Sequence, residues 1–195
     1  MNPVLRLTWA VVCVLLFGVV ATTAGELLSV NVTGTNAGNA GVGESFCASG
    51  DGRFVAFNSS STNLVVPDTN GLADVFVRDC TLRTNVWSTV AARGGVTGSS
   101  PIQFTSDGRF LLFTAYATNL FPGATNPSVV QLYRRDLWSN ETALVSLAFD
   151  GSNAAAKSAS AASGARSGAL TMTAEGRFIL FTTAATNIVA GVNTG

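Results

Sequence analysis

The nine residues Thr105-Ser-Asp-Gly-Arg-Phe-Leu-Leu-Phe113 decide the fold, because the sequence contains them in three versions. The other two versions are Ser49-Gly-Asp-Gly-Arg-Phe-Val-Ala-Phe57 and Thr173-Ala-Glu-Gly-Arg-Phe-Ile-Leu-Phe181. Each version is followed by Thr-Asn and an aliphatic residue, at 62–64, 118–120 and 186–188. Such matches predict an internal repeat, and therefore a fold that is built from similar units.

Each repeat is predicted to form four strands. The acid–glycine pair favours a tight hairpin between the first two strands. The second strand, such as Arg109–Phe113, is apolar on both faces, which is typical of a strand that is buried from both sides. The other predicted strands are the third strands at 75–79 and 132–136, the fourth strands at 86–91 and 143–148, and a lone leading strand at 27–32.

Small four-stranded sheets that are covered on both faces stack face to face, as the blades of a β-propeller do. We therefore expect an all-β fold of β-propeller-type blades, with repeats at about 44–91, 100–148 and 170–195. The predicted strands make fewer than three blades, whereas closed propellers have about four to eight. The pattern places the next strand just after Gly195, so we expect a fragment of a larger protein or a chain that associates through faces as apolar as Phe54/Ala56 and Val55/Phe57.

The first 24 residues are predicted to be an export signal, separate from the propeller domain at 25–195. Arg6 provides a positive start, residues 7–21 are an apolar run, and Thr22-Thr23-Ala24 offers a cleavage site with small residues. The alternative is an uncleaved membrane anchor, for which the run is short of the roughly 20 residues that span a bilayer. We expect an exported protein, periplasmic or extracellular, that contacts the membrane only if this segment remains.

The repeat residues also resemble a known family, the WD-like, TolB-like propeller repeat of exported bacterial proteins. The family pattern is carried here by Ser49–Phe57, Ser61–Gly71, Asp74–Asp79 and Asn85–Thr89. This resemblance implies the propeller fold and an exported location. It implies a function only loosely, because the family supplies docking surfaces, lids on enzymes and parts of larger surface proteins. The sequence departs from the pattern at Ala124–Pro127, and the stretch at 152–169 is rich in Ala, Ser and Gly and predicts a surface loop.

Composition and charge exclude several classes of function. The chain has 11 basic and 11 acidic residues and a formal charge of zero, which argues against a nucleic-acid partner because such a protein needs a basic surface. It contains no histidine, so Ser-His-Asp and Cys-His catalysis and His-ligated metals are excluded within this sequence. No pair of carboxylates is set apart from the repeat positions, as a glycosidase would require. We therefore expect no enzymatic activity, no cofactor and no catalytic residue.

A weak calcium candidate lies at 68–74, where Asp68, Asn70 and Asp74 place acid and amide oxygens at alternating positions near a glycine. The bidentate Glu of a calcium loop is missing, and the alternative is a turn closed by side-chain hydrogen bonds. Because calcium requires six to eight oxygens, we expect no tight site here.

Two further sets of residues carry predictions. Arg53, Arg109 and Arg177 recur at one repeat position, and Asp79 and Asp136 recur at another, which indicates a structural role within or between blades. Cys47 and Cys80 are expected to remain thiols. The strands that carry the two cysteines are separated by one other strand, which puts the two Cα atoms about 9.6 Å apart. A disulfide spans at most roughly 7 Å between Cα atoms.

The sequence therefore predicts an exported, non-catalytic module that interacts with a protein or another ligand. Its partner is expected to be another protein or further blades of the same protein. An alternative is the propeller portion of a secreted hydrolase whose catalytic domain lies elsewhere.

Overall fold

The computed structural model describes residues 12–13, 26–66, 68, 72–87, 97–116, 120–121, 129–151, 159–160 and 170–191. These residues form strands, turns and loops, and none of them lies in a helix, so the predicted all-β class is confirmed. Within the same ranges, no helix is long and apolar enough to cross a membrane.

The first two repeats form the predicted four-stranded antiparallel sheets. The first sheet has the order β3-β4-β5-β6 and the second has the order β7-β8-β9-β10. Their bounds are Val42–Ala48 (β3), Phe54–Ser59 (β4), Asp74–Asp79 (β5), Thr84–Trp87 (β6), Thr97–Phe104 (β7), Phe110–Tyr116 (β8), Gln131–Asp136 (β9) and Glu141–Leu144 (β10). Both fourth strands begin two residues earlier than predicted. The turn between the third and fourth strands needs only four residues, because its last residue, Arg83 or Asn140, has a positive φ that completes the reversal of the chain.

The third repeat is described in part. β12 (Thr171–Met172) pairs with β13 (Ile179–Leu180), and β11 (Ala159–Ser160) pairs with β14 (Thr182–Thr183). The pairing of Ala159 with Thr183 matches that of Val42 with Ser59 in the first sheet, so β11 and β12 together occupy the place of a first strand. The predicted loop at 152–169 therefore contains a strand, because β11 lies within it.

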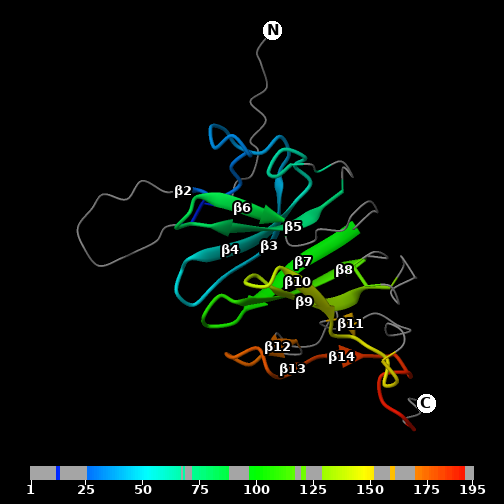
Figure 1. The fold of residues 1–195 in the computed structure, drawn as a ribbon. Coiled ribbons are helices and arrows are strands. Elements are labelled where there is room, and N and C mark those ends of the chain that lie inside the picture. Colours follow the sequence, from blue (N-terminus) through cyan, green and yellow to red (C-terminus); the bar gives the residue numbers. More distant parts are fainter. Residues whose placement is uncertain are drawn as a thin grey trace.

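The sheets are stacked in sequence order, with the first sheet above the second and the strands of the third repeat below (Figure 1). We call the face of each sheet that looks toward the next repeat its distal face, and the opposite face its proximal face. The distal face of the first sheet packs on the proximal face of the second in one buried cluster, formed by Phe54, Ala56, Val75, Val77, Phe104, Leu111, Phe113, Ala115, Tyr133 and Leu144. The distal face of the second sheet packs on the third repeat through Leu112, Leu132 and Met172. The described residues form an open stack of blades, as an incomplete propeller requires.

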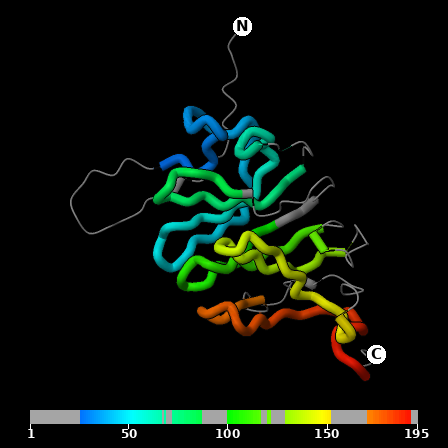
Figure 2. The backbone as a smooth tube through the Cα atoms, viewed as in Figure 1, coloured from blue at the N-terminus to red at the C-terminus, as the bar shows by residue number. Residues whose placement is uncertain are grey.

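The proximal face of the first sheet is covered by the chain itself, which corrects the prediction that this face is exposed. Val55 and Phe57 are 3% and 0% exposed. Leu64, from the loop after β4, packs on Phe57. The segment that begins at β2 (Glu26–Leu27) lies over the same sheet (Figure 2), where the Asn85 side chain donates a hydrogen bond to the Val30 carbonyl. Residues 26–41 and 60–66 together make what we call the N-terminal cover.

The predicted leading strand at 27–32 is wrong in extent. Only β2, which pairs with β1 (Val12–Cys13), and an isolated bridge between Val30 and Ala37 are formed there. The reason is the turn between Val30 and Ala37. The backbone N–H groups of Thr35 and Asn36 donate to the Asn31 side chain there, and a continuous strand cannot make these bonds.

Cys47 and Cys80 are both thiols, as predicted, with no disulfide between them. Cys47 on β3 is paired with Ala56 of β4, and Cys80 follows the end of β5, so β4 separates them. Burial raises the pKa of the Cys47 thiol to about 12. A thiol with so high a pKa forms little of the reactive thiolate.

Candidate functional site

The acid–glycine turn has the same internal bonds in the first two repeats. In the second repeat the Thr105 hydroxyl donates to the Asp107 carboxylate, which also accepts the backbone N–H of Arg109, while the N–H of Phe110 donates to Thr105. Ser49, Asp51, Arg53 and Phe54 make the equivalent bonds in the first repeat. The turn glycines Gly52, Gly108 and Gly176 have φ values of 71°, 69° and 71°, a conformation that favours glycine over other residues.

These hydrogen bonds lower the pKa values of the turn acids in the first two repeats. The hydrogen bond from Ser49 holds the pKa of the Asp51 carboxyl below its usual value, and the hydrogen bond from Thr105 does the same for Asp107. These carboxylates therefore act within the turn, where they stabilise the hairpin.

The recurring arginine and aspartate side chains form an ion pair within each of the first two sheets. Arg53 contacts Asp79 at 2.8 Å, and Arg109 contacts Asp136 at 2.8 Å. The structural role that the sequence predicted for these positions is thus seen in the geometry. The hydrogen bond from Arg109 lowers the pKa of Asp136 to about 2. Burial alone would raise the pKa of Asp79, but the hydrogen bonds from Arg53 and from two backbone N–H groups outweigh it and lower that pKa.

The phenylalanine after each of these arginines is held between its own arginine and the glycine of the next repeat. The Arg53 guanidinium lies 4.7 Å from the centroid of the Phe54 ring. On the other side, a Cβ atom added to Gly108 would lie only 2.7 Å from Cδ2 of Phe54. This close approach aligns the second sheet on the first.

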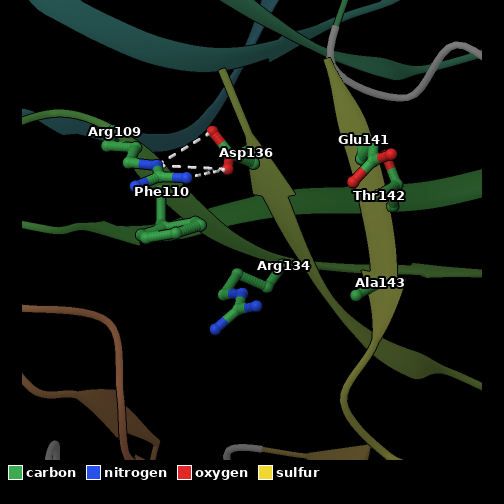
Figure 3. A pocket seen from close by; sticks show the side chains of 7 residues that line it. All are labelled: Arg109, Phe110, Arg134, Asp136, Glu141, Thr142 and Ala143. Carbon is green, nitrogen blue, oxygen red and sulfur yellow. Dashed lines mark hydrogen bonds and ion pairs between the residues drawn. The ribbon is translucent and has the colours of Figure 1, made fainter. Parts of the chain in front are cut away.

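The same arrangement joins the second repeat to the third. Arg109 lies 4.7 Å from the Phe110 ring centroid and Arg134 lies 4.5 Å from it (Figure 3). A Cβ atom added to Gly176 would lie 2.8 Å from Phe110, and Arg134 donates a hydrogen bond of 3.0 Å to the Gly176 carbonyl. Each junction between repeats therefore uses one phenylalanine and one turn glycine.

The third repeat has the phenylalanine, but no described residue of a further repeat lies over its distal face. Arg177 lies 5.0 Å from the centroid of the Phe178 ring, as in the other repeats. Phe178 is 63% exposed and Leu180 is 65% exposed, whereas the equivalent residues Phe54 and Leu112 are 7% and 0% exposed. We call the surface formed by the exposed side chains of Phe178 and Leu180 the open distal face. Two shallow depressions of about 400 and 430 Å³ adjoin it, and Ile179 and Leu180 line both.

A third depression, of about 450 Å³, lies at the outer edge of the second sheet (Figure 3). It is lined by Arg109, Phe110, Arg134, Asp136, Glu141, Thr142 and Ala143. The charged groups in it have internal partners, since Arg109 is paired with Asp136 and Arg134 bonds to the Gly176 carbonyl. Its polar groups serve the sheet and the junction between repeats.

The weak calcium candidate at 68–74 is not assembled in the described residues. Asp68 and Asp74 are both buried, and Asp74 is the first residue of β5, opposite Ser59. Asn70 lies outside the described residues. Among the described side chains, no group of three or more His, Cys, Asp or Glu residues could hold a metal ion. The calcium site stays a prediction.

The sequence predicted two exposed apolar faces at the ends of the stack but did not name Phe178 and Leu180. The exposed face at the third repeat is found, whereas the proximal face of the first sheet is covered. A signal was present in the sequence, because Phe178 and Leu180 stand at positions whose neighbours in the first two repeats come from the repeat that follows.

No family model matches the sequence, and no curated protein matches it. Among solved structures, TolB from Acinetobacter baumannii is similar over 75% of this chain, with 18% sequence identity and a TM-score of 0.44. The aligned part is 28% of the TolB chain, so this chain spans less than a third of the length of that structure.

Proposed function

We propose that this chain is an exported, non-catalytic β-propeller-type module that binds a protein partner through the open distal face of its third repeat. The observation that carries the proposal is the exposure of Leu180, whose equivalents Ala56 and Leu112 are fully buried, and of Phe178, whose equivalents Phe54 and Phe110 are buried and partly buried. Contiguous exposed apolar surface of this kind marks an interaction site. Covering the exposed part of the Leu180 side chain favours association by about 1–2 kcal/mol, before the entropic cost of binding is subtracted.

The chemistry of this face favours a protein as the partner. The depression that extends along residues 179–189 is lined mainly by apolar side chains, among them Phe181, Ile188 and Val189. Within the first two junctions, the same distal positions are covered by the face of another β-sheet. An apolar face whose equivalents are covered by sheets suits a second sheet better than a small ligand, which binds in a deep concave pocket.

The ion pairs support a role without catalysis. Asp79 and Asp136 are held by arginines, and Asp51 and Asp107 are held by the turns they close. A general acid or base needs a pKa near the working pH, whereas the pKa values of these four carboxyls are all lowered. Binding in this proposal involves no cofactor and no nucleic acid.

The export pattern at 1–24 is the basis for the proposed location. The partly buried Cys47 thiol is compatible with an oxidising compartment, because its raised pKa slows its oxidation.

The experiment compares the full chain with two lysine variants on exposed apolar residues. Leu180→Lys places a charge on the open distal face, and Val66→Lys places the same charge on the N-terminal cover, where Val66 is also exposed. Immobilised wild-type chain and Val66→Lys are expected to retain the same protein from an exported-protein fraction, and Leu180→Lys is expected to lose it. Equal retention by all three variants would contradict the proposed function.

A further inference from the structure

The third strand of each complete sheet provides hydrogen-bond partners for the side chain and the carbonyl of the arginine that follows the acid–glycine turn. Arg53 donates through Nε and Nη2 to Oδ2 of Asp79, at 3.1 and 2.8 Å, and the Arg53 carbonyl accepts the N–H of Cys80 at 2.8 Å. The second sheet repeats this set with Arg109, Asp136 and the N–H of Leu137, which donates to the Arg109 carbonyl at 2.8 Å. One strand end therefore provides both a carboxylate and a backbone donor.

Arg177 occupies the same position in the third repeat. Its guanidinium stacks on Phe178 as the others stack on theirs. Within the described residues, it forms no ion pair with a carboxylate, and its carbonyl accepts no backbone N–H. β13 pairs with β12 along one edge, and no described strand pairs with its other edge. Among the described residues, the edge that receives a third strand in the complete sheets is thus unpaired beside Arg177.

The two third strands share a pattern that describes what would fit this edge. Residues 75–79 and 132–136 both read aliphatic, aromatic, any residue, arginine, aspartate. In both sheets the aspartate is opposite the phenylalanine of the second strand, Phe54 or Phe110. At β13 the same register puts an aspartate opposite Phe178, next to the Arg177 guanidinium.

We propose that the open edge of β13 binds an extended strand of a partner protein in antiparallel register, with an aspartate of that strand held by Arg177. This inference rests on the proposed function and specifies its partner as a protein with an accessible strand that ends in aspartate. Backbone hydrogen bonds along β13 supply affinity, and the Arg177–aspartate pair selects the register. A second copy of this chain is a poor donor, because its strands with the pattern, β5 and β9, are paired on both edges.

The test uses a fluorescent synthetic peptide with the sequence of residues 130–139, which carries the aspartate at position 136. Binding to the full chain is followed by fluorescence anisotropy, and hydrogen exchange locates the contact. The wild-type chain is expected to bind the peptide and to protect the amides of Ile179 and Phe181, whose equivalents donate to the third strand in the complete sheets. Arg177→Gln in the chain, or Asp136→Asn in the peptide, is expected to weaken binding about fivefold, as for a partly exposed ion pair. The two changes together are expected to weaken it no further, because both remove one interaction.

The matched control is Arg53→Gln, the same change in a repeat whose third strand is present, and it is expected to leave peptide binding unchanged. Restored affinity between an Arg177→Asp chain and an Asp136→Arg peptide would support the pair directly. An affinity for the peptide that stays the same after all these charge changes, or no binding at all, would overturn strand addition at Arg177. Retention of a protein that still depends on Leu180 would then leave the proposed function standing, so the two failures are distinguishable. Self-association that buries residues 178–180 would also overturn the inference.

Discussion

The second and third repeats begin with nearly the same residues and end in different environments. Arg109-Phe110-Leu111-Leu112 and Arg177-Phe178-Ile179-Leu180 follow equivalent acid–glycine turns. Leu112 is completely buried, because the third repeat covers it, whereas Leu180 is 65% exposed. The comparison teaches that burial in this fold belongs to the junction between repeats. A repeat can build its turn alone, but it cannot bury its distal face alone.

The strongest way to break this comparison is to shorten both leucines. Leu112→Ala is expected to lower the free energy of unfolding by about 2–5 kcal/mol, because it leaves a cavity in a packed junction. Leu180→Ala is expected to change it by less than about 0.5 kcal/mol, as for a surface position. Urea unfolding followed by tryptophan fluorescence measures both. Similar losses for the two variants would mean that Leu180 is covered in solution.

The turn glycines provide the next test. Gly108→Ala is expected to destabilise by about 1–2 kcal/mol for the positive φ, and further because the new Cβ meets the Phe54 ring. Gly191→Ala is the matched control, since Gly191 has a φ of 76° and no described atom lies within 4 Å of an added Cβ. The difference between the two variants isolates the contact between repeats. If Phe54→Leu fails to reduce that difference, the packing of Gly108 on Phe54 does not align the sheets.

The Arg109–Asp136 pair predicts a dependence on pH. The pKa of Asp136 is lowered to about 2 in the folded chain, so its stabilising effect is complete above the ordinary carboxyl pKa of about 4 and is lost as the pH falls toward 2. Asp136→Asn is expected to cost about 1 kcal/mol at pH 7 and to have progressively less effect below about pH 4. Urea midpoints of both proteins between pH 7 and 2 measure the difference. A cost that stays constant down to pH 2 would contradict the ion pair.

The smallest expected effect is that of Arg177→Gln on stability. Arg109→Gln removes an ion pair and is expected to lower the melting temperature measurably, whereas Arg177→Gln removes, among the described contacts, its stacking on Phe178 and is expected to lower it less. Thermal unfolding of the two variants measures this difference. Equal costs would reveal a carboxylate partner for Arg177 and would close the proposed strand site.

Much of the fold follows from the repeat, because hairpin turns and strands that are apolar on both faces have local causes. The acid–glycine turns, the four-stranded sheets and the separation of Cys47 from Cys80 were predictable for this reason. The N-terminal cover was not, because Leu28 reaches the first sheet through an irregular segment without a periodic pattern, and the recurring triplet that contains Leu64 does not show which face its leucine covers. The ion pairs were predicted only as recurring residues, because the pairing of Arg109 with Asp136 depends on the register of two strands that 14 residues separate.

The N-terminal cover has a consequence for how such a chain can change its length during evolution. Residues 26–41 and 60–66 close the proximal face of the first sheet with contacts that no later repeat contributes, such as Glu26 with Arg78. The junctions that follow both use one phenylalanine and one turn glycine at equivalent positions. A duplicated repeat that is inserted between the first two would therefore find a matching surface on either side, and its insertion would leave the cover intact. Gain or loss of whole repeats is then tolerated in the interior of the stack, while the covered end must be inherited unchanged.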